Sequence, residues 1–174
     1  MPAHPEDFSE PQELHAIVQQ LAQALTERGW MMATAESCTG GMIAAACTDL
    51  PGSSRWFDRG FVTYSNAAKT EMLGVPAELI AKHGAVSEAV VRSMAEGAAK
   101  HAGVPVAVAV TGVAGPDGGS PDKPVGTVWI ATYCAGIITA HCLHLQGSRA
   151  DIRAATSMQA LQGVISYLPA LQPQ

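Results

Sequence analysis

The sequence predicts a layered α/β fold, in which helices cover a mixed, mainly parallel sheet. Three observations support this prediction. Short apolar runs of strand length alternate with segments whose apolar residues recur at helical spacing. Of the 174 residues, 48% are hydrophobic and only 14% are charged, which suits a packed core and excludes a disordered chain. No repeat or linker interrupts the pattern, so we expect one domain over residues 12–170, after a flexible tail over residues 1–11.

The first half of the chain begins with an amphipathic helix. Apolar residues from Leu14 to Leu25 follow a helical period, and Gly29 ends the segment. Asn66 and Gly74 mark the start and the end of a second helix. The other elements expected here are a buried strand over 30–36, a helix of small residues over 39–49, a strand over 57–65 and a helical turn over 76–84.

The second half contains the most strand-like run of the chain, over 104–112, which consists mainly of small and β-branched residues. A helix over 87–103 precedes it, with Ser87 placed to cap its first turn. A loop rich in Gly, Pro and Asp follows over 113–124. The remaining elements are strands over 125–136 and 137–146, joined at Ala135-Gly136 as an antiparallel hairpin that makes the sheet mixed, and a helix over 148–168.

Charge and composition argue against several classes of partner and site. The net charge is −5 and the ten Lys and Arg residues are scattered, so we expect no nucleic-acid surface. No apolar run approaches the roughly 18 residues of a membrane span. The four cysteines lack CxxC spacing, which favours free thiols in a reducing cytoplasm. The six histidines form no zinc-type pattern, and we expect no metal site.

Three polar, turn-rich stretches follow the predicted parallel strands: AESCTGG (35–41), TYSNAAK (63–69) and TGVAGPDGG (111–119). In an open α/β sheet, ligands bind beyond the carboxyl ends of the parallel strands. The coincidence of three such stretches at strand ends predicts one site built from all of them.

The stretch AESCTGG has two interpretations. Ser37, Cys38 and Thr39 lie where a helix begins, and a serine or threonine there could simply cap the helix by accepting a free backbone N–H. Gly40 and Gly41, however, weaken a first helical turn by up to about 1 kcal/mol each. That loss is useful if a phosphate or a developing oxyanion must approach the backbone N–H groups at the positive end of the helix.

Lys69 is the candidate base in the second stretch. Lysines on helices are usually solvated, but this one lies within one turn of a strand end and could reach Ser37. A desolvated lysine has a lowered pKa and can accept a proton from a serine hydroxyl. Tyr64 could orient the amine or relay a proton, or be a half-buried strand residue. Arg149 and Arg153, near the start of the last helix, could reach a phosphate or pair with neighbouring acids.

The third stretch supplies Thr111, Gly112, Ala114 and Gly115. Its spacing fits neither GxxxxGK[ST] nor GxGxxG, which excludes a P-loop and a dinucleotide fingerprint. A tight surface loop would have the same composition. Its position after a predicted strand favours a loop that wraps around a ligand.

The segments AESCTGG, GFVTYSNAAK, HGAVSE, AVTGVAGPDGG and KPVGTVWIA, in this order, closely resemble the CinA C-terminal domain family. The resemblance runs from about Leu14 to about Leu168, and its five ordered motifs make it specific. The family includes stand-alone nicotinamide-nucleotide amidohydrolases, whereas its longer members carry an additional N-terminal domain. The resemblance implies a three-layer α/β/α fold with a sheet of five strands, one of them antiparallel, which agrees with the hairpin.

The resemblance also implies hydrolysis of the carboxamide of nicotinamide mononucleotide to nicotinate mononucleotide and ammonia, in pyridine nucleotide salvage. Ser37 is then the nucleophile, Lys69 the base and Tyr64 the third catalytic residue. Backbone N–H groups near the start of the 39–49 helix would hold the oxyanion. No metal or organic cofactor is required. We assign substrate binding to Cys38, Thr39, Gly40, Gly41, Thr111, Gly112, Ala114, Gly115 and Arg149.

Two rival interpretations stay open. Cys38 could be the nucleophile, since a thiol near a helix N-terminus can be acidified, although no histidine lies in the three stretches to pair with it. A non-catalytic nucleotide-binding or regulatory module could keep the same pocket, although the presence of Ser37, Tyr64 and Lys69 argues against it. As partners we expect a small pyridine nucleotide and further copies of this chain, and neither nucleic acid nor a membrane.

Overall fold

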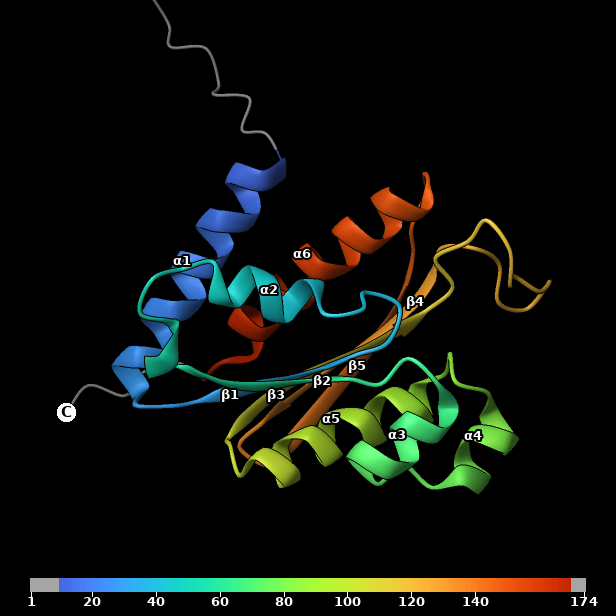
Figure 1. The fold of residues 1–174 in the computed structure, drawn as a ribbon, viewed down its shortest axis with the longest axis horizontal. Coiled ribbons are helices and arrows are strands. Elements are labelled where there is room, and N and C mark those ends of the chain that lie inside the picture. The colour runs from blue at the N-terminus through green and yellow to red at the C-terminus, as the bar shows by residue number, and fades with distance from the viewer. Residues whose placement is uncertain (1–9, 170–174) are drawn as a thin grey trace, which may run out of the picture.

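Within residues 10–169, which the computed structural model describes, a five-stranded sheet runs between two layers of helices (Figure 1). The strands are β1 (Met32–Glu36), β2 (Phe57–Val62), β3 (Val106–Gly112), β4 (Thr127–Cys134) and β5 (Ile137–His144). The helices are α1 (Glu10–Arg28), α2 (Met42–Thr48), α3 (Asn66–Leu73), α4 (Ala77–His83), α5 (Glu88–Ala102) and α6 (Arg149–Tyr167), with a 3₁₀ turn over Ser53–Arg55.

The strand order of the sheet is β2-β1-β3-β4-β5. Strand β1 pairs in parallel with β2 on one side and with β3 on the other, whereas β4 pairs antiparallel with both β3 and β5. In this sheet β4 therefore runs against the other strands, which confirms the predicted mixed α/β/α fold. The β4–β5 hairpin turns at Ala135 and Gly136, whose φ angles are +48° and +91°. Because β1, β2 and β3 are parallel, their carboxyl ends meet at one edge of the sheet.

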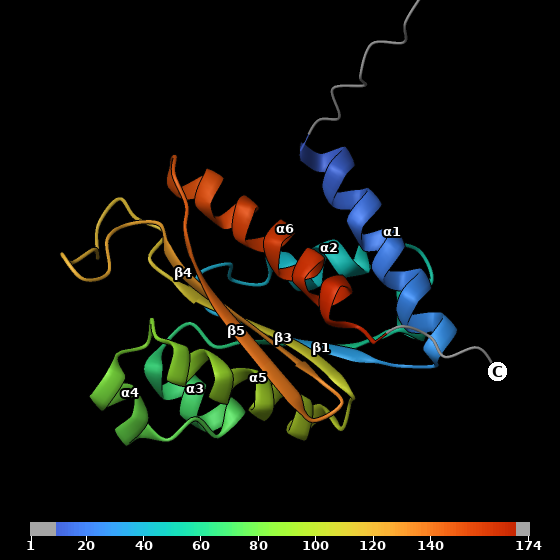
Figure 2. The ribbon, with the colours of Figure 1, turned by 180° about the vertical axis from the view of Figure 1, so that it is seen from behind.

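The two faces of the sheet differ in the size of their side chains. Along β3, Val106, Val108 and Val110 point to one face, while Ala107 and Ala109 point to the other. The valine face packs under α1, α2 and α6. The small alanine side chains allow α5 to lie directly against the opposite face, where Figure 2 also shows α3 and α4.

Most elements form where the sequence predicts them, with differences at two helix starts. Glu10 and Pro11 belong to α1 rather than to the predicted tail, and the rest of that tail, residues 1–9, lies outside the described residues, as do 170–174. The helix predicted over 39–49 is shorter. It begins at Met42 because Gly40 and Gly41 have φ angles of +60° and +107°, outside the right-handed helical region. None of the described helices is long and apolar enough to cross a membrane.

Candidate active site

Ser37 follows the last residue of β1, at the edge where the three parallel strands end. Its backbone N–H donates to the carbonyl oxygen of Val110 on β3 at 3.2 Å. Its own carbonyl oxygen accepts from the N–H of Gly40 at 3.1 Å, so the chain turns sharply after the serine. The serine is thereby held against β3 with its side chain only 9% exposed.

Glu36, the last residue of β1, carries a fully buried carboxylate that the sequence interpretation did not single out. Its Oε1 accepts from Thr39 Oγ1 at 2.6 Å and from the N–H of Ile43 at 2.8 Å, and its Oε2 accepts from the N–H of Ala44 at 3.0 Å. The carboxylate thus occupies the start of α2, where N–H groups have no partner within the helix. In the sequence, the signal that pointed to Glu36 was a charged residue at the end of an apolar run, because a buried charge needs partners.

Arg153 holds the same turn from α6. Its Nε donates to the carbonyl oxygen of Cys38 at 3.0 Å, and its Nη2 donates to that of Thr39 at 3.2 Å. A guanidinium presents its donors in a rigid fork, so these two bonds fix two consecutive peptide groups. Arg153 therefore binds the protein backbone, and not the acidic side chains that the sequence left open as partners.

Lys69 reaches Ser37 from α3. Its Nζ donates to Ser37 Oγ at 3.1 Å and to the carbonyl oxygens of Thr63 at 2.8 Å and Tyr64 at 3.2 Å. The side chain is 1% exposed, and among the described residues no carboxylate lies within ion-pair distance of it. Burial without a counter-ion lowers the pKa of the Lys69 ammonium.

The start of α3 explains why Lys69 points back to the strand ends. Ser65 is the N-cap, and its side chain accepts from the N–H of Ala68 at 3.0 Å, which fixes the first turn directly after β2. Lys69 follows on that turn, and its N–H donates to the carbonyl oxygen of Ser65 at 3.2 Å. Helical side chains lean toward the N-terminus, which here is the direction of Ser37.

A cavity of about 180 Å³ opens beside Ser37 and Lys69. Loops from all three parallel strand ends line it, together with the first residue of α6. The predicted site residues that line it are Ser37, Cys38, Tyr64, Lys69, Thr111, Gly112, Ala114 and Arg149, and further lining residues are Asn66, Ala85 and Val86.

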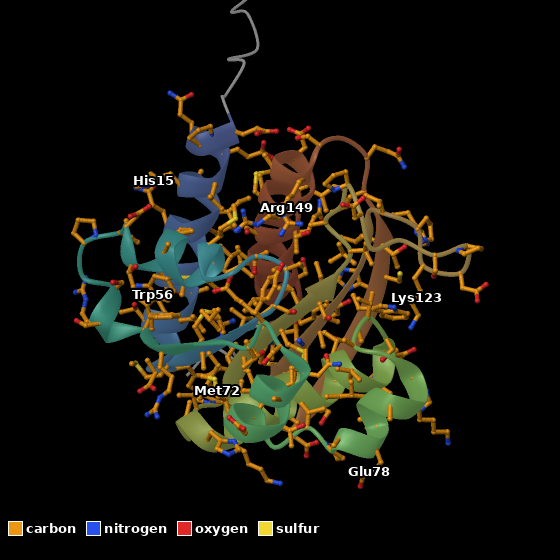
Figure 3. The ribbon with its side chains drawn as sticks, turned by 45° about the vertical axis from the view of Figure 1, so that its right-hand side comes forward. His15, Trp56, Met72, Glu78, Lys123 and Arg149 are labelled. Carbon is orange, nitrogen blue, oxygen red and sulfur yellow. The ribbon has the colours of Figure 1, made fainter. Side chains whose placement is uncertain are left out.

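Arg149 and Tyr64 form the exposed rim of this cavity. Arg149 Nη1 donates to the carbonyl oxygen of Gly115 at 2.7 Å, and Nη2 donates to the Tyr64 hydroxyl at 3.2 Å. Tyr64 is 62% exposed, and it contacts Lys69 through its backbone carbonyl and not through its hydroxyl. Figure 3 shows Arg149 at the start of α6, where Ser148 caps the helix.

Thr111 and Gly112, at the end of β3, also line this cavity. The Thr111 hydroxyl donates to the carbonyl oxygen of Ala85 at 2.9 Å and so holds the loop before α5. A Cβ on Gly112 would lie 2.7 Å from Val128 Cγ2 and 3.0 Å from the carbonyl oxygen of Thr127. Only glycine therefore fits between the cavity and β4.

Cys38 lies beside Ser37 but has the wrong environment for a nucleophile. Its side chain is 5% exposed, and burial raises the pKa of its thiol to about 11, helped by the negative charge of Glu36. The thiolate is the reactive form of cysteine, so this thiol is inert at neutral pH. The environment favours Ser37 over the rival interpretation.

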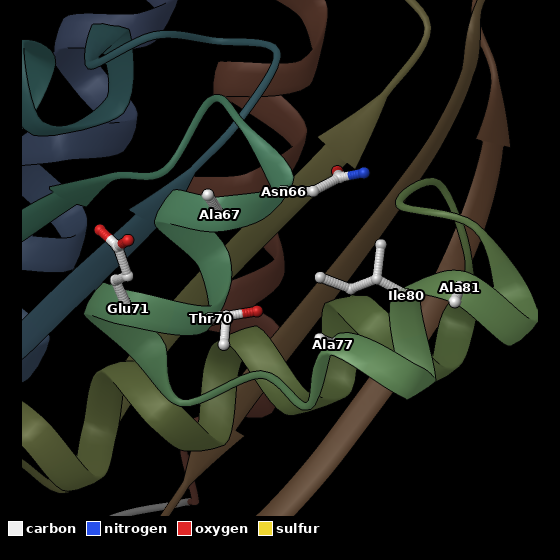
Figure 4. Close-up of a pocket in the computed structure, with 7 residues that line it drawn as sticks. All are labelled: Asn66, Ala67, Thr70, Glu71, Ala77, Ile80 and Ala81. Atoms are coloured by element: carbon white, nitrogen blue, oxygen red, sulfur yellow. The ribbon is translucent and has the colours of Figure 1, made fainter.

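A second cavity, of about 420 Å³, lies between α3 and α4 (Figure 4). It shares Asn66 with the cavity beside Ser37, and Ala67, Ala77 and Ile80 give it a largely apolar lining. Glu71 is the acidic residue on its lining, and neither a nucleophile nor a base faces it as Lys69 faces Ser37. The groups suited to catalysis lie at the smaller cavity.

The family model of the CinA C-terminal domain matches residues 14–168 of this chain. The chain belongs to the CinA C-terminal domain family. It is 53% identical over 153 residues to the Escherichia coli K12 protein named nicotinamide-nucleotide amidohydrolase PncC, covering 86% of this chain and 92% of that one. The crystal structure of the competence/damage inducible protein CihA from Agrobacterium tumefaciens matches with a TM-score of 0.87 and 43% identity, over 95% of this chain and 98% of that one.

Other members of the CinA family are longer. A CinA-like protein of Citrifermentans bemidjiense is 54% identical over 148 residues, which cover 85% of this chain but 36% of that protein. The chain therefore spans less than two fifths of the length of such longer relatives.

In this CinA domain, some predicted binding residues do not line the cavity. Thr39 is fully buried and donates to Glu36, and Gly40 and Gly41 form the turn before α2. Gly115 contributes its carbonyl oxygen to Arg149. Among the described residues, no group of three His, Cys, Asp or Glu side chains could hold a metal ion.

Proposed function

We propose that this chain is a nicotinamide-nucleotide amidohydrolase, in which Ser37 attacks the carboxamide of nicotinamide mononucleotide and Lys69 accepts the serine proton. The observation that carries the proposal is the 3.1 Å contact between Lys69 Nζ and Ser37 Oγ, two buried groups at the carboxyl ends of the parallel strands. The 53% identity to the Escherichia coli protein of that name supports the choice of substrate.

The surroundings of Lys69 suit a base that alternates between amine and ammonium. A neutral amine has two N–H donors, which the carbonyl oxygens of Thr63 and Tyr64 can accept, and one lone pair, which then faces the Ser37 hydroxyl. As the bond from Ser37 Oγ to the carboxamide carbon forms, the serine proton moves to Lys69. The ammonium then returns this proton to the departing nitrogen, the C–N bond breaks, and ammonia leaves an acyl-serine. Water hydrolyses that ester, which releases the acid and restores the hydroxyl.

The structure narrows the choice of backbone donors that could hold the oxyanion. The N–H groups of Ile43 and Ala44, at the start of α2, donate to Glu36 and are not free for a ligand. The N–H of Cys38 donates to no oxygen atom among the described residues and faces only its own thiol, and Cys38 lines the cavity next to Ser37. We assign it the role of oxyanion donor, a contribution often worth about 3 kcal/mol.

Arg149 is the candidate for the phosphate group. The cavity of about 180 Å³ is smaller than the roughly 300–1,000 Å³ usual for ligand pockets, so it suits the pyridine end of the nucleotide. The phosphate would then lie at the rim, where Arg149 and the Tyr64 hydroxyl are exposed. We further propose that this chain acts in pyridine nucleotide salvage, in the cytoplasm and as a homo-oligomer.

The test is ammonia release from nicotinamide mononucleotide by the purified protein, with nicotinamide and its riboside as comparisons. The mononucleotide should be the best substrate because only it offers a phosphate to Arg149. Ser37→Ala should lower kcat by several orders of magnitude with the fold intact, whereas Cys38→Ser should keep most of it.

Release of ammonia from no pyridine nucleotide would support the non-catalytic binding module instead. An active Ser37→Ala variant together with an inactive Cys38→Ser variant would show that the chemistry belongs to the neighbouring thiol.

A further inference from the structure

Glu36 is a buried charge that the proposed chemistry does not use. Its side chain is fully buried, and it does not line the cavity beside Ser37. Among the described residues, no Lys, Arg or His lies within ion-pair distance of it. A buried carboxylate without a cation is unfavourable unless hydrogen bonds compensate for the lost hydration. Three donors do so, two of them at the positive end of α2.

These three hydrogen bonds span the turn that carries Ser37. Glu36 precedes the serine, Thr39 follows it by two residues, and Ile43 and Ala44 lie in the first turn of α2. The carboxylate therefore ties the end of β1, the middle of the turn and the start of α2 to one point. Arg153 donates to the carbonyl oxygens of Cys38 and Thr39 in the same turn, so two charged side chains, Glu36 and Arg153, hold it.

The backbone of Glu36 also connects the two partners of the proposed dyad. Its carbonyl oxygen accepts from the N–H of Thr63 at 2.8 Å, and the carbonyl oxygen of Thr63 in turn accepts from Lys69 Nζ at 2.8 Å. A shift of Glu36 would thus move Ser37 directly and the acceptor of Lys69 indirectly. The 3.1 Å contact between Lys69 and Ser37 depends on where this one residue lies.

We propose that Glu36 is a positioning residue: its carboxylate, through Thr39 and the first turn of α2, holds Ser37 Oγ in line with Lys69 without touching the substrate. The kinetic test of this inference rests on the proposed function, whereas its test by chemical labelling of Ser37 does not. Loss of the carboxylate should lower the reactivity of Ser37. The backbone hydrogen bond from Thr63 to Glu36 does not involve the carboxylate, so the surroundings of Lys69 and the rim of the cavity should stay in place.

The first variant is Glu36→Gln. Glutamine keeps the shape of the side chain, but its amide N–H₂ group would face one of the backbone N–H donors, which then loses its acceptor. We expect kcat to fall by about 10²-fold, as for a small displacement of a reacting group. KM should stay within about threefold, because the groups that bind the nucleotide are unchanged. The apparent pKa of the rate profile should also be unchanged, because the carboxylate makes no contact with Lys69.

The second comparison is Thr39→Val against Thr39→Ser. Valine has nearly the same volume as threonine but lacks the hydroxyl that donates to Glu36, whereas serine keeps this hydroxyl. We expect kcat of the valine variant to be about tenfold below that of the serine variant. This pair provides the answer if Glu36→Gln does not fold. Val164→Ala, a truncation in the core near the end of α6, controls for lost stability and should keep kcat within about twofold.

A chemical readout separates this inference from the proposed function. An arylsulfonyl fluoride forms a sulfonate ester at a reactive serine with loss of fluoride, and mass spectrometry gives the rate of labelling at Ser37. We expect labelling in the wild type and slower labelling in Glu36→Gln and Thr39→Val, even if no ammonia is released from the nucleotide. Equal kcat and equal labelling in the Thr39 pair, or an unlabelled wild-type Ser37, would overturn the positioning role.

Discussion

At the residue scale, burial decides which side chains of the site can react. It lowers the pKa of Lys69 and raises the pKa of Cys38 to about 11, because in each case the charged form loses its hydration. The lowered pKa favours the neutral amine that the proposed mechanism needs, and the raised pKa keeps Cys38 in its thiol form. In the proposed mechanism Ser37 reacts as a hydroxyl whose proton passes to the neighbouring amine during attack.

The pH dependence of the reaction should report the state of Lys69. The ammonium form cannot accept a proton, so kcat/KM should be low at acidic pH and rise as the lysine deprotonates. The midpoint should lie below the ordinary lysine pKa of about 10.4, in the direction that burial imposes. Initial rates of ammonia release across the pH range measure it.

Two variants of Lys69 separate a base from a fixed positive charge. Lys69→Met should remove the rise of kcat/KM with pH and most of the rate, whereas the affinity for the nucleotide should be largely kept. Lys69→Arg should not restore activity, because a guanidinium does not lose its proton in this pH range. Near-normal turnover by Lys69→Arg would mean that the residue acts as a cation and that another group is the base.

At the element scale, the turn from β1 to α2 determines the geometry of the site. The two glycines of this turn need explanation, and the sequence interpretation related them to the approach of a ligand. In the structure Gly40 and Gly41 do not line the cavity, and both have positive φ angles, of +60° and +107°. Glycine is required there because the backbone reverses between strand and helix, which allows Ser37 to project from the end of the sheet.

Gly40→Ala and Gly103→Ala form a matched pair for this turn. Both glycines have nearly the same φ, +60° and +65°, and a Cβ would meet only Arg153 Nη2 at 3.4 Å in the first case and nothing within 4 Å in the second. Each substitution should cost about 1–2 kcal/mol of unfolding free energy, measured in urea. Only Gly40→Ala should also slow turnover, by about tenfold, because its strained residue lies in the turn that carries Ser37, whereas Gly103 ends α5. Equal rates for the two variants would show that the turn tolerates the displacement.

At the scale of the whole molecule, the site needs both helical layers in place. Lys69 comes from α3 below the sheet, whereas Arg149 and Arg153 come from α6 above it (Figure 1). The position of α3 depends on α5, which it meets where Gly97 lies against the backbone of Leu73. Small residues on α5 thus set the distance between Lys69, the proposed base, and the sheet.

Gly97→Ala should disturb this packing, and Gly163→Ala is its control on another helix. A Cβ on Gly97 would lie 2.0 Å from the carbonyl oxygen of Leu73, whereas the nearest atom to a Cβ on Gly163 is Thr132 Oγ1 at 4.0 Å. Gly97→Ala should cost about 1–3 kcal/mol of unfolding free energy and lower kcat, since α3 must move. Gly163→Ala should add about 0.5–1 kcal/mol of stability and leave kcat unchanged. A stable and fully active Gly97→Ala variant would show that α3 can shift without disturbing Lys69.

The sequence by itself determined the order of helices and strands, the mixed sheet and the edge at which the site lies. These features follow from local information: the period of apolar residues, the cap at Ser87, the helix start at Ser148 and the polar stretches after the strands. The same local reasoning placed Ser37 and Lys69 within reach of each other, because parallel strands bring their carboxyl ends to one edge.

Only the tertiary structure decided which polar groups are partners. Arg153 lies 115 residues after Cys38 in the chain, yet it holds the carbonyl of that residue, and the same turn is held from within by Glu36. No local pattern encodes such pairs, because a buried donor or acceptor takes whichever partner the packing of distant elements brings to it. For that reason the sequence predicted that Ser37 and Lys69 lie within reach of each other but not the charged residues Glu36 and Arg153 that hold the turn beside them.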